Sequence, residues 1–275
     1  MIEVIDRIPT HPGRVKLVPV EGQENTFDMV RADEPIEVGT PINKALFDSM
    51  QDTIAHAVQT IDNKVFEMSQ RVEIGNLADG SPLGLYENGV LIPYYKVNGN
   101  YEKSGRVLVI RADITHLTSI YTSAQTSYIQ SAIDTWLNGE FLRRLDTATQ
   151  SVLGTVPVPV IGGTGATVLN RKSFLLSFRE YSITNLGEVL GSANALFAST
   201  TRRISAYNGT PTTHFTRDTI PGNNAVGVIG TDGMGSFVDK LTVAGIRPAL
   251  TLPATFEVTA GMPSTANVNA TAEVI

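Results

Sequence analysis

The stretch that decides the fold is GRVLVIRADITHLTSIYTSAQTSYIQSAIDTWLNGEFLRRL, residues 105–145. It opens with a short apolar strand at residues 107–110 and continues into two short amphipathic helices. The first helix follows Ser127, which we expect to be its N-cap, and ends at Asn138; the second covers residues 140–145. The first helix presents one apolar face, made of Ile129, Ala132, Ile133, Trp136 and Leu137. We therefore expect this strand and helical pair to be the seed of the core.

The amino-acid composition limits the classes of protein to which this chain can belong. The 275 residues are 42% hydrophobic and 17% charged, which is typical of a globular chain with one sizeable core. The net charge of -6 and the absence of Lys and Arg clusters argue against nucleic acid as a partner. No apolar run approaches the roughly 20 residues that span a bilayer, so we expect no membrane insertion. The chain has no cysteine, which excludes disulfides, thiolate metal sites and thiol nucleophiles.

Residues 1–40 have the composition of an arm. They are rich in Pro, Gly, Glu and Asp, with two short alternating runs at residues 15–20 and 26–31. A frayed terminus is one interpretation. The apolar residues Phe27 and Met29 favour the other, a segment that docks on another protein. The opening residues do not resemble a signal peptide, so we expect synthesis in the cytosol.

Residues 41–73 predict a long helix, which begins with Thr40 as N-cap and Pro41 in the first helical position. Apolar residues recur with a period of 3.5, and β-branched residues at both seam positions favour a trimer. The predicted trimer seam consists of Phe47, Gln51, Ile54, Val58, Ile61, Val65, Met68 and Val72. The alternative is a single amphipathic helix that lies on its own domain, because complementary flanking charges are few.

Residues 74–258 predict short antiparallel strands covered by the helical layer. Asn88 and Gly89 between apolar runs predict a hairpin turn, and the prolines in residues 156–161 allow only an edge or irregular strand. Residues 162–167 are glycine-rich but lack the lysine and helix of a phosphate loop, so they predict a hairpin tip. Ser177 and Glu180 have capping-box spacing. Residues 259–275 form a tail that is either disordered or one more exposed strand.

The predicted fold class is therefore α+β. It comprises an attachment arm (1–40), a trimeric coiled-coil helix (41–73), a domain of short antiparallel strands with a helical layer (74–258) and a tail (259–275).

Several residues of the loop-rich carboxyl half have side chains that bind ligands in other proteins. His214 and Phe215 could stack on a sugar, although a lone histidine in a strand is as readily a packed residue. Oxygen ligands for calcium would be Asp218, Asn223, Asn224 and Asp232, but their spacing matches no calcium loop and turn formation explains them better. We expect no metal, no cofactor and no catalysis, since the acids of this region stand in turn contexts rather than as a paired set.

Motifs in both halves of the chain resemble those of phage proteins. In the amino-terminal half they are residues 9–15, 27–33 and 39–45, which resemble the first segment of phage tail-fibre and baseplate-associated proteins. In the carboxyl-terminal half they are residues 106–113, 133–139, 173–177 with Glu180, 207–209 and 245–253. These resemble a C-type-lectin-like domain of phage tail fibres, which is similar to the variable proteins of diversity-generating retroelements.

The resemblance implies a homotrimeric virion adhesin. The arm would attach to other virion proteins, of the tail or baseplate, and the lectin-like domain would bind a bacterial cell-surface ligand. In such proteins the ligand-contacting residues lie on the loop-rich face before the closing strand. Here that face would be formed by His214, Phe215, Arg217, Asp218, Asn223, Asn224 and Asp232. The alternative is a purely structural virion fibre or decoration protein of the tail, neck or capsid, without a ligand.

Overall fold

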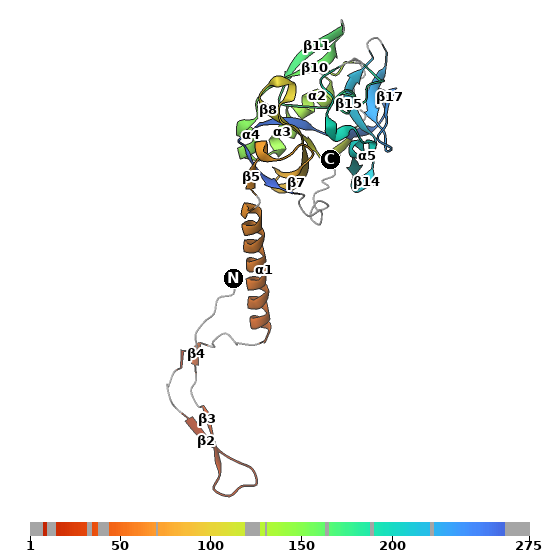
Figure 1. Cartoon of the computed structure of the whole chain (residues 1–275). Helices are drawn as coiled ribbons and strands as arrows, with labels where there is room; N and C mark the ends of the chain where they lie inside the picture. Colours follow the sequence, from red (N-terminus) through yellow and green to blue (C-terminus); the bar gives the residue numbers. More distant parts are fainter. Residues whose placement is uncertain are drawn as a thin grey trace. The chain divides into compact units, whose positions relative to one another are not determined.

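The computed structural model describes residues 8–9, 15–31, 35–37, 44–69, 71–118, 127–129, 131–162, 165–187, 190–220 and 223–261. The chain divides into two compact units, an amino-terminal unit Met1–Val65 and a carboxyl-terminal unit Phe66–Ile275 (Figure 1). Each unit is described by itself. Within the described residues, no helix combines the length and the apolar character that a membrane crossing requires.

The amino-terminal unit contains two antiparallel strand pairs. β2 (Val15–Pro19) pairs with β3 (Phe27–Arg31), and β1 (Ile8–Pro9) pairs with β4 (Pro35–Glu37). The two alternating runs of the arm are thus the strands of one hairpin, the β2–β3 hairpin.

Helix α1 (Lys44–Ser69) occupies most of the range predicted as helical. The predicted cap and first helical position, Thr40 and Pro41, lie outside the described residues. At the other end the helix stops before β5 (Arg71–Glu73), so Val72 belongs to a strand and not to the predicted seam. The other seam residues whose surroundings are described are exposed: Phe47, Gln51, Ile54, Val58 and Ile61.

The predicted α+β class with a trimeric coiled coil and a lectin-like domain is wrong. In the part of the chain that is described, the structure is mostly β, with 41% of residues in strands and 22% in helices, and the carboxyl-terminal unit has four short helices there. The described seam residues of α1 are exposed in the single chain, and the structure does not support the predicted trimeric coiled coil. The physical reason for the high strand content is that the apolar strands share their core with a second sheet and need few helices to cover them.

The larger sheet of the carboxyl-terminal unit has seven antiparallel strands in the order β12-β19-β8-β7-β6-β20-β5. Its other strands are β6 (Pro82–Glu87), β7 (Val90–Asn98), β8 (Arg106–Arg111), β12 (Ser173–Phe174), β19 (Ala249–Pro253) and β20 (Glu257–Ala260). Residues 107–110 of β8 have no exposed surface. A continuous apolar run is what a strand buried on both faces requires, and the predicted seed strand is confirmed.

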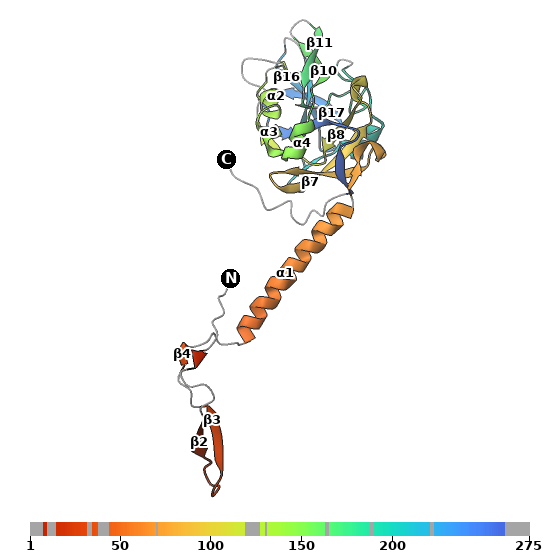
Figure 2. The ribbon, with the colours of Figure 1, turned by 90° about the vertical axis from the view of Figure 1, so that its left-hand side faces the viewer.

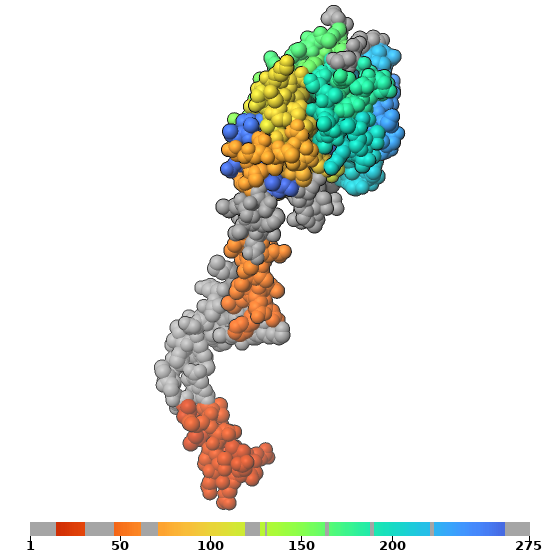
Figure 3. Space-filling view, in the orientation of Figure 1, coloured from red at the N-terminus to blue at the C-terminus, as the bar shows by residue number. Residues whose placement is uncertain are grey.

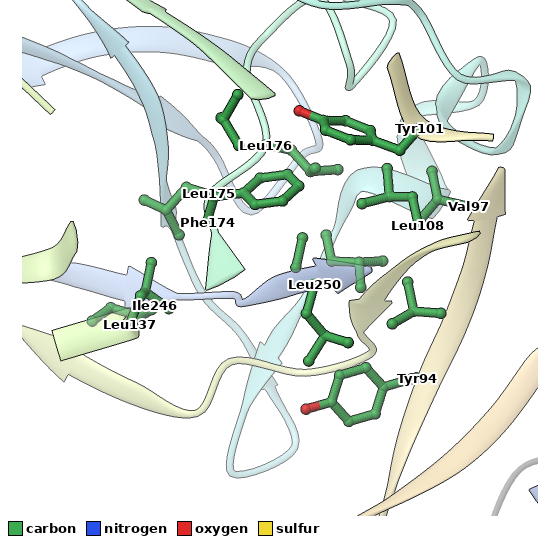
Figure 4. Packing of buried hydrophobic residues seen from close by; sticks show 14 of the residues in the cluster. Tyr94, Val97, Tyr101, Leu108, Leu137, Phe174, Leu175, Leu176, Ile246 and Leu250 are labelled. Carbon is green, nitrogen blue, oxygen red and sulfur yellow. The ribbon is translucent and has the colours of Figure 1, made fainter. Parts of the chain in front are cut away.

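The smaller sheet has five strands in the order β17-β16-β15-β18-β9. They are β9 (His116–Thr118), β15 (His214–Thr219), β16 (Ala225–Ile229), β17 (Gly235–Asp239) and β18 (Ala244–Ile246). One cluster of buried apolar residues joins the two sheets. Figure 4 shows part of it, where the ring of Phe174 stacks on Tyr101 with 5.0 Å between ring centroids.

Short helices complete the core. They are α2 (Ala132–Leu137), α3 (Glu140–Arg144), α4 (Thr147–Val152), α5 (Thr200–Arg203), and the 3-10 turns η1 (Ile74–Asn76), η2 (Tyr101–Lys103) and η3 (Ala195–Phe197). Figures 1 and 2 show α2, α3 and α4 lying together. The N-cap of α2 is Ser131, whose Oγ accepts a hydrogen bond from Asp134 N at 3.1 Å. The predicted cap, Ser127, instead donates to Ile161 O at 3.2 Å, so the helix begins later than expected.

Two predicted hairpins are confirmed. Asn88 and Gly89 join β6 to β7 and have φ angles of 49° and 79°, the left-handed values that an Asn-Gly turn of this type needs. β10 (Val156–Gly162) pairs with β11 (Gly165–Arg171) around the glycine-rich tip, and the two form a sheet of their own. A third, shorter pair is β13 (Ala206–Tyr207) with β14 (Thr210–Pro211). The predicted tail begins inside β20, and residues 262–275 lie outside the described residues.

Gly227 of β16 packs tightly against the side chains of Thr216 in β15 and of Phe178. A Cβ at this position would lie 2.3 Å from Thr216 Oγ1 and 2.8 Å from Phe178 Cζ. We expect Gly227→Ala to lower the free energy of unfolding by about 1–3 kcal/mol, because the added methyl overpacks the core. Urea unfolding measures this. Gly99→Ala is the matched control, since its Cβ would meet nothing within 4 Å; equal losses for the two variants would contradict the packing argument.

Candidate functional site

Four of the seven predicted ligand residues are buried. His214, Phe215, Arg217 and Asp218 expose 0–1% of their surface. They lie on β15, the middle strand of the smaller sheet. The structure therefore corrects their assignment to a loop-rich surface: these side chains serve the core and are out of reach of a ligand on the surface.

The guanidinium of Arg217 joins three separate segments of the chain. Nε donates to Pro159 O of β10 at 2.7 Å, and Nη1 donates to Leu175 O at 2.8 Å. Nη2 donates to Glu180 Oε1 at 2.8 Å, and Nη1 also bonds the second oxygen of Glu180. Burial by itself would lower the pKa of Arg217, but the carboxylate of Glu180 holds it above its ordinary value. Arg217 therefore keeps its positive charge in the interior.

Glu180 is fixed by its own turn and by Tyr101. Ser177 N donates to Glu180 Oε2 at 3.0 Å, and Glu180 N donates to Ser177 Oγ at 3.1 Å. This is the capping box that the sequence predicted. The hydroxyl of Tyr101 donates to Glu180 Oε1 at 3.0 Å. Both carboxylate oxygens are thus hydrogen-bonded to the chain, which leaves no open position for a substrate.

Asp218, the neighbour of Arg217, is only half satisfied. Its Oδ2 accepts a hydrogen bond from Phe178 N at 2.7 Å, whereas its buried Oδ1 has no partner among the described atoms. Burial raises the pKa of Asp218 to about 6, although Arg217 acts in the opposite direction. The carboxyl group is therefore protonated in mildly acidic solution.

The pKa of His214 is shifted in the opposite direction to that of Asp218. Its Nε2 lies 3.2 Å from the hydroxyl of Tyr181, and its buried Nδ1 has no partner among the described atoms. Burial, helped by the nearby charge of Arg247, lowers the pKa of His214 to about 3. The imidazole is therefore neutral, and it packs against Tyr181 with 5.7 Å between ring centroids.

The remaining predicted ligand residues are exposed but do not share one site. Asn223 and Asn224 come just before β16, and Asp232 comes just after it, so they lie at opposite ends of the strand. Asn223 Oδ1 accepts from Asn224 N at 2.7 Å, and Asp232 Oδ1 accepts from Met234 N at 2.9 Å. These are bonds of turn-forming residues. Within the described ranges no three Asp, Glu or His side chains come together as metal ligands.

The chain's single tryptophan forms a partly exposed cluster that the sequence did not predict. The ring of Trp136 lies 5.1 Å from the ring of His116 and 5.1 Å from Arg144 Cζ. Arg144 Nη2 in turn donates to Glu140 Oε1 at 2.9 Å. Burial and the charge of Arg144 lower the pKa of His116. The sequence assigned Trp136 to the buried face of its helix; the charged residues of the next helix were the signal that its edge meets solvent.

A cleft of about 320 Å³ lies between β6, β20 and α4. Its apolar lining includes Leu85 and Val258, and Arg71 and Glu257 face each other across 3.8 Å at its edge. None of the seven predicted ligand residues lines it.

Comparison with known proteins shows the family to which most of the carboxyl-terminal unit belongs. Residues 104–254 match the family model described as Domain of unknown function (DUF6273). The chain belongs to this family. The matched part runs from β8 to β19, so the DUF6273 domain contains the Arg217–Glu180 pair and the Trp136 cluster. No curated protein and no solved structure matches the chain.

Removal of one partner of the buried ion pair is expected to destabilise the fold strongly. Arg217→Met leaves the Glu180 carboxylate buried without a counter-ion, and we expect the free energy of unfolding to fall by about 3–5 kcal/mol. Arg71→Met is the control, because it breaks the exposed pair with Glu257 and should cost less than about 1 kcal/mol. Urea unfolding measures both. The double variant Arg217→Met with Glu180→Leu should recover part of the loss; a small loss in Arg217→Met would refute the role of the pair.

Asp218 and His214 are expected to give opposing pH dependences of stability. The pKa of Asp218 is raised in the fold, so its contribution is greatest below pH 3.8 and is lost as pH rises towards 6. The pKa of His214 is lowered, so its contribution is greatest above pH 6.5 and is lost as pH falls towards 3. Between about pH 4 and pH 6 the two slopes, each about 1.4 kcal/mol per pH unit, nearly cancel.

Single variants separate the two slopes. Relative to the unmodified chain, Asp218→Asn should make stability rise with pH over this interval, and His214→Gln should make it fall. Urea unfolding at several pH values measures the slopes, with Asp232→Asn as an exposed control that leaves them unchanged. Slopes that do not differ among the variants would show that neither group titrates abnormally.

Proposed function

We propose that this DUF6273 protein is a phage virion adhesin without catalysis, which attaches to the tail or baseplate through residues 1–40 and binds a bacterial surface ligand through its carboxyl-terminal unit. The resemblance of residues 9–15, 27–33 and 39–45 to phage tail-fibre and baseplate-associated proteins supports this assignment. A homotrimer remains a prediction. The protein would be made in the host cytoplasm and act on the virion.

The apolar face of the β2–β3 hairpin carries the proposal. The register pairs Leu17 with Met29 and places Val15 and Phe27 on the same face. These four side chains expose 51–74% of their surface. A two-stranded hairpin is marginally stable by itself in water, and an apolar face of this kind marks a docking surface. The opposite face carries Lys16 and Asp28 beside the smaller apolar residues Val18 and Val30, so it is the more polar of the two faces.

Burial of β15 favours a second candidate function. Because four of the seven predicted ligand residues lie in the core, a structural virion protein that docks through the same hairpin and binds no host ligand accounts for the arm equally well. The two candidates differ only in whether the carboxyl-terminal unit binds cells.

Two readouts on one set of variants test the proposal. Leu17→Ser with Met29→Ser makes the apolar face polar, and Lys16→Ser with Asp28→Ser is the matched control on the other face. Tagged chains are produced in cells that assemble the parent phage, and the tagged copies in purified particles are counted. We expect the first variant to lose incorporation by about tenfold or more and the control to retain it, since each 1.4 kcal/mol of lost contact is about tenfold.

Labelled full-length protein is then titrated onto intact host cells. Saturable binding that survives Leu17→Ser with Met29→Ser supports the adhesin. Incorporation without cell binding supports the structural alternative, and unchanged incorporation of the apolar-face variant would refute attachment through the hairpin.

A further inference from the structure

β11 is an open strand edge. β10 is its one partner among the described strands, and its seven residues make it longer than the edge strands of the two large sheets, which have two to five residues. Residues 165–170 contain no charge and no proline. Natural proteins protect exposed edges with such residues, and an unprotected edge of this length is a template for another strand.

The open edge of β11 is ordered in the single chain, without a bound partner. Arg171, at the end of β11, bonds both oxygens of Asp134 at 2.7 and 2.8 Å. Pro159 O of the paired strand accepts from Arg217 Nε at 2.7 Å. Both strands of the hairpin are thus anchored to the core by arginines, so an added strand would bind a preformed edge and not have to order it.

The inner face of β11 has room for more apolar contact. Leu169 stands opposite Val158, which is fully buried, but is itself only partly buried. Thr167 stands opposite the buried Val160 and is exposed. A strand on the open side of β11 would extend this face and cover Leu169.

The end of the chain has the sequence of such a strand. Residues 265–274 lie outside the described residues and alternate strictly: Ala266, Val268, Ala270, Ala272 and Val274 occupy one parity, and polar residues separate them. This is the period of a strand with one apolar face. Its residues are small and carry one charge, Glu273, which suits the uncharged edge of β11.

The strand cannot come from the same chain. Figures 1 and 2 place β11 at one end of the carboxyl-terminal unit and β7 at the other, and β20, after which the tail leaves, lies two strands from β7. Figure 3 shows the β10–β11 hairpin, in green, at the surface. Residues 262–264 bridge at most about 10 Å. A compact unit of this size measures roughly 40 Å across.

We propose that residues 265–274 of a second copy of the chain pair with β11 as a third strand. The contact is head-to-tail, because the edge and the tail are different surfaces of each copy, and it generates a closed ring or a filament. It is independent of the hairpin that carries the proposed function and would hold in a protein that binds no host ligand.

Hydrogen exchange of the full chain and of a variant that ends at Gly261 tests the proposal. The amides of residues 165–171 that point away from β10 should exchange about tenfold or more slowly in the full chain at high concentration, and this protection should fade on dilution. The shortened chain should lose both the protection and the larger mass in solution. A synthetic peptide of residues 262–275 should restore the protection without restoring the mass, since the peptide has no β11 of its own.

A peptide with Val268→Asn and Asn269→Val is the matched control. It keeps the composition but moves the valine to the polar face, and it should protect β11 much less. Three outcomes would overturn the proposal: equal exchange in the full and shortened chains, peptide protection on β17 instead of β11, or protection of β11 in the shortened chain, which would show that two β11 edges pair with each other.

Discussion

The buried ion pair between Arg217 and Glu180 is the interaction on which the interior of the carboxyl-terminal unit depends. Charges in a protein interior are stable only when every polar atom is paired, because desolvation costs several kcal/mol per ion. Arg217 meets this condition with carbonyls of β10 and of Leu175, and Glu180 meets it with Ser177 and Tyr101. The partners come from parts of the chain far apart in sequence. The pair therefore fixes the position of β15 against β10 and the capping-box turn together.

Other buried polar groups of the carboxyl-terminal unit are satisfied less completely. Arg247 exposes 1% of its surface and bonds the carbonyls of Arg111 and Arg203 at 2.9 and 3.3 Å, with no carboxylate as partner in the described residues. His214 and Asp218 each keep one buried atom without a partner in that same part of the chain. Among the described residues the interior thus contains a second buried ion pair, Arg111–Glu87 at 2.9 Å, and several groups that bond only backbone oxygens or keep one polar atom without a partner.

Local signals in the sequence were sufficient for the features that local chemistry determines. The Asn88-Gly89 turn, the apolar run at residues 107–110 and the capping box of Ser177 are all present, because each depends on neighbours within a few residues. β15 was misread for the opposite reason. A polar strand predicts exposure, and the groups that satisfy it lie 37 to 58 residues away. Ser127 failed as a cap because Ile161 takes its hydroxyl.

Burial of β15 also narrows where a ligand could be held. If the unit binds a surface ligand as proposed, the predicted ligand residues that are exposed lie in the turns at the two ends of β16, and these turns differ in their side chains. At one end Asp232 is already bonded to the following turn, and Met234 is the exposed apolar residue. At the other end Asn223 and Asn224 lie beside the loop after β17, since Lys240 N donates to Asn224 O at 2.8 Å. That loop exposes 63% of Leu241 and 62% of Val243. Two amides next to two exposed aliphatic side chains make this end the better surface for a ligand, because it offers polar selection and apolar area together.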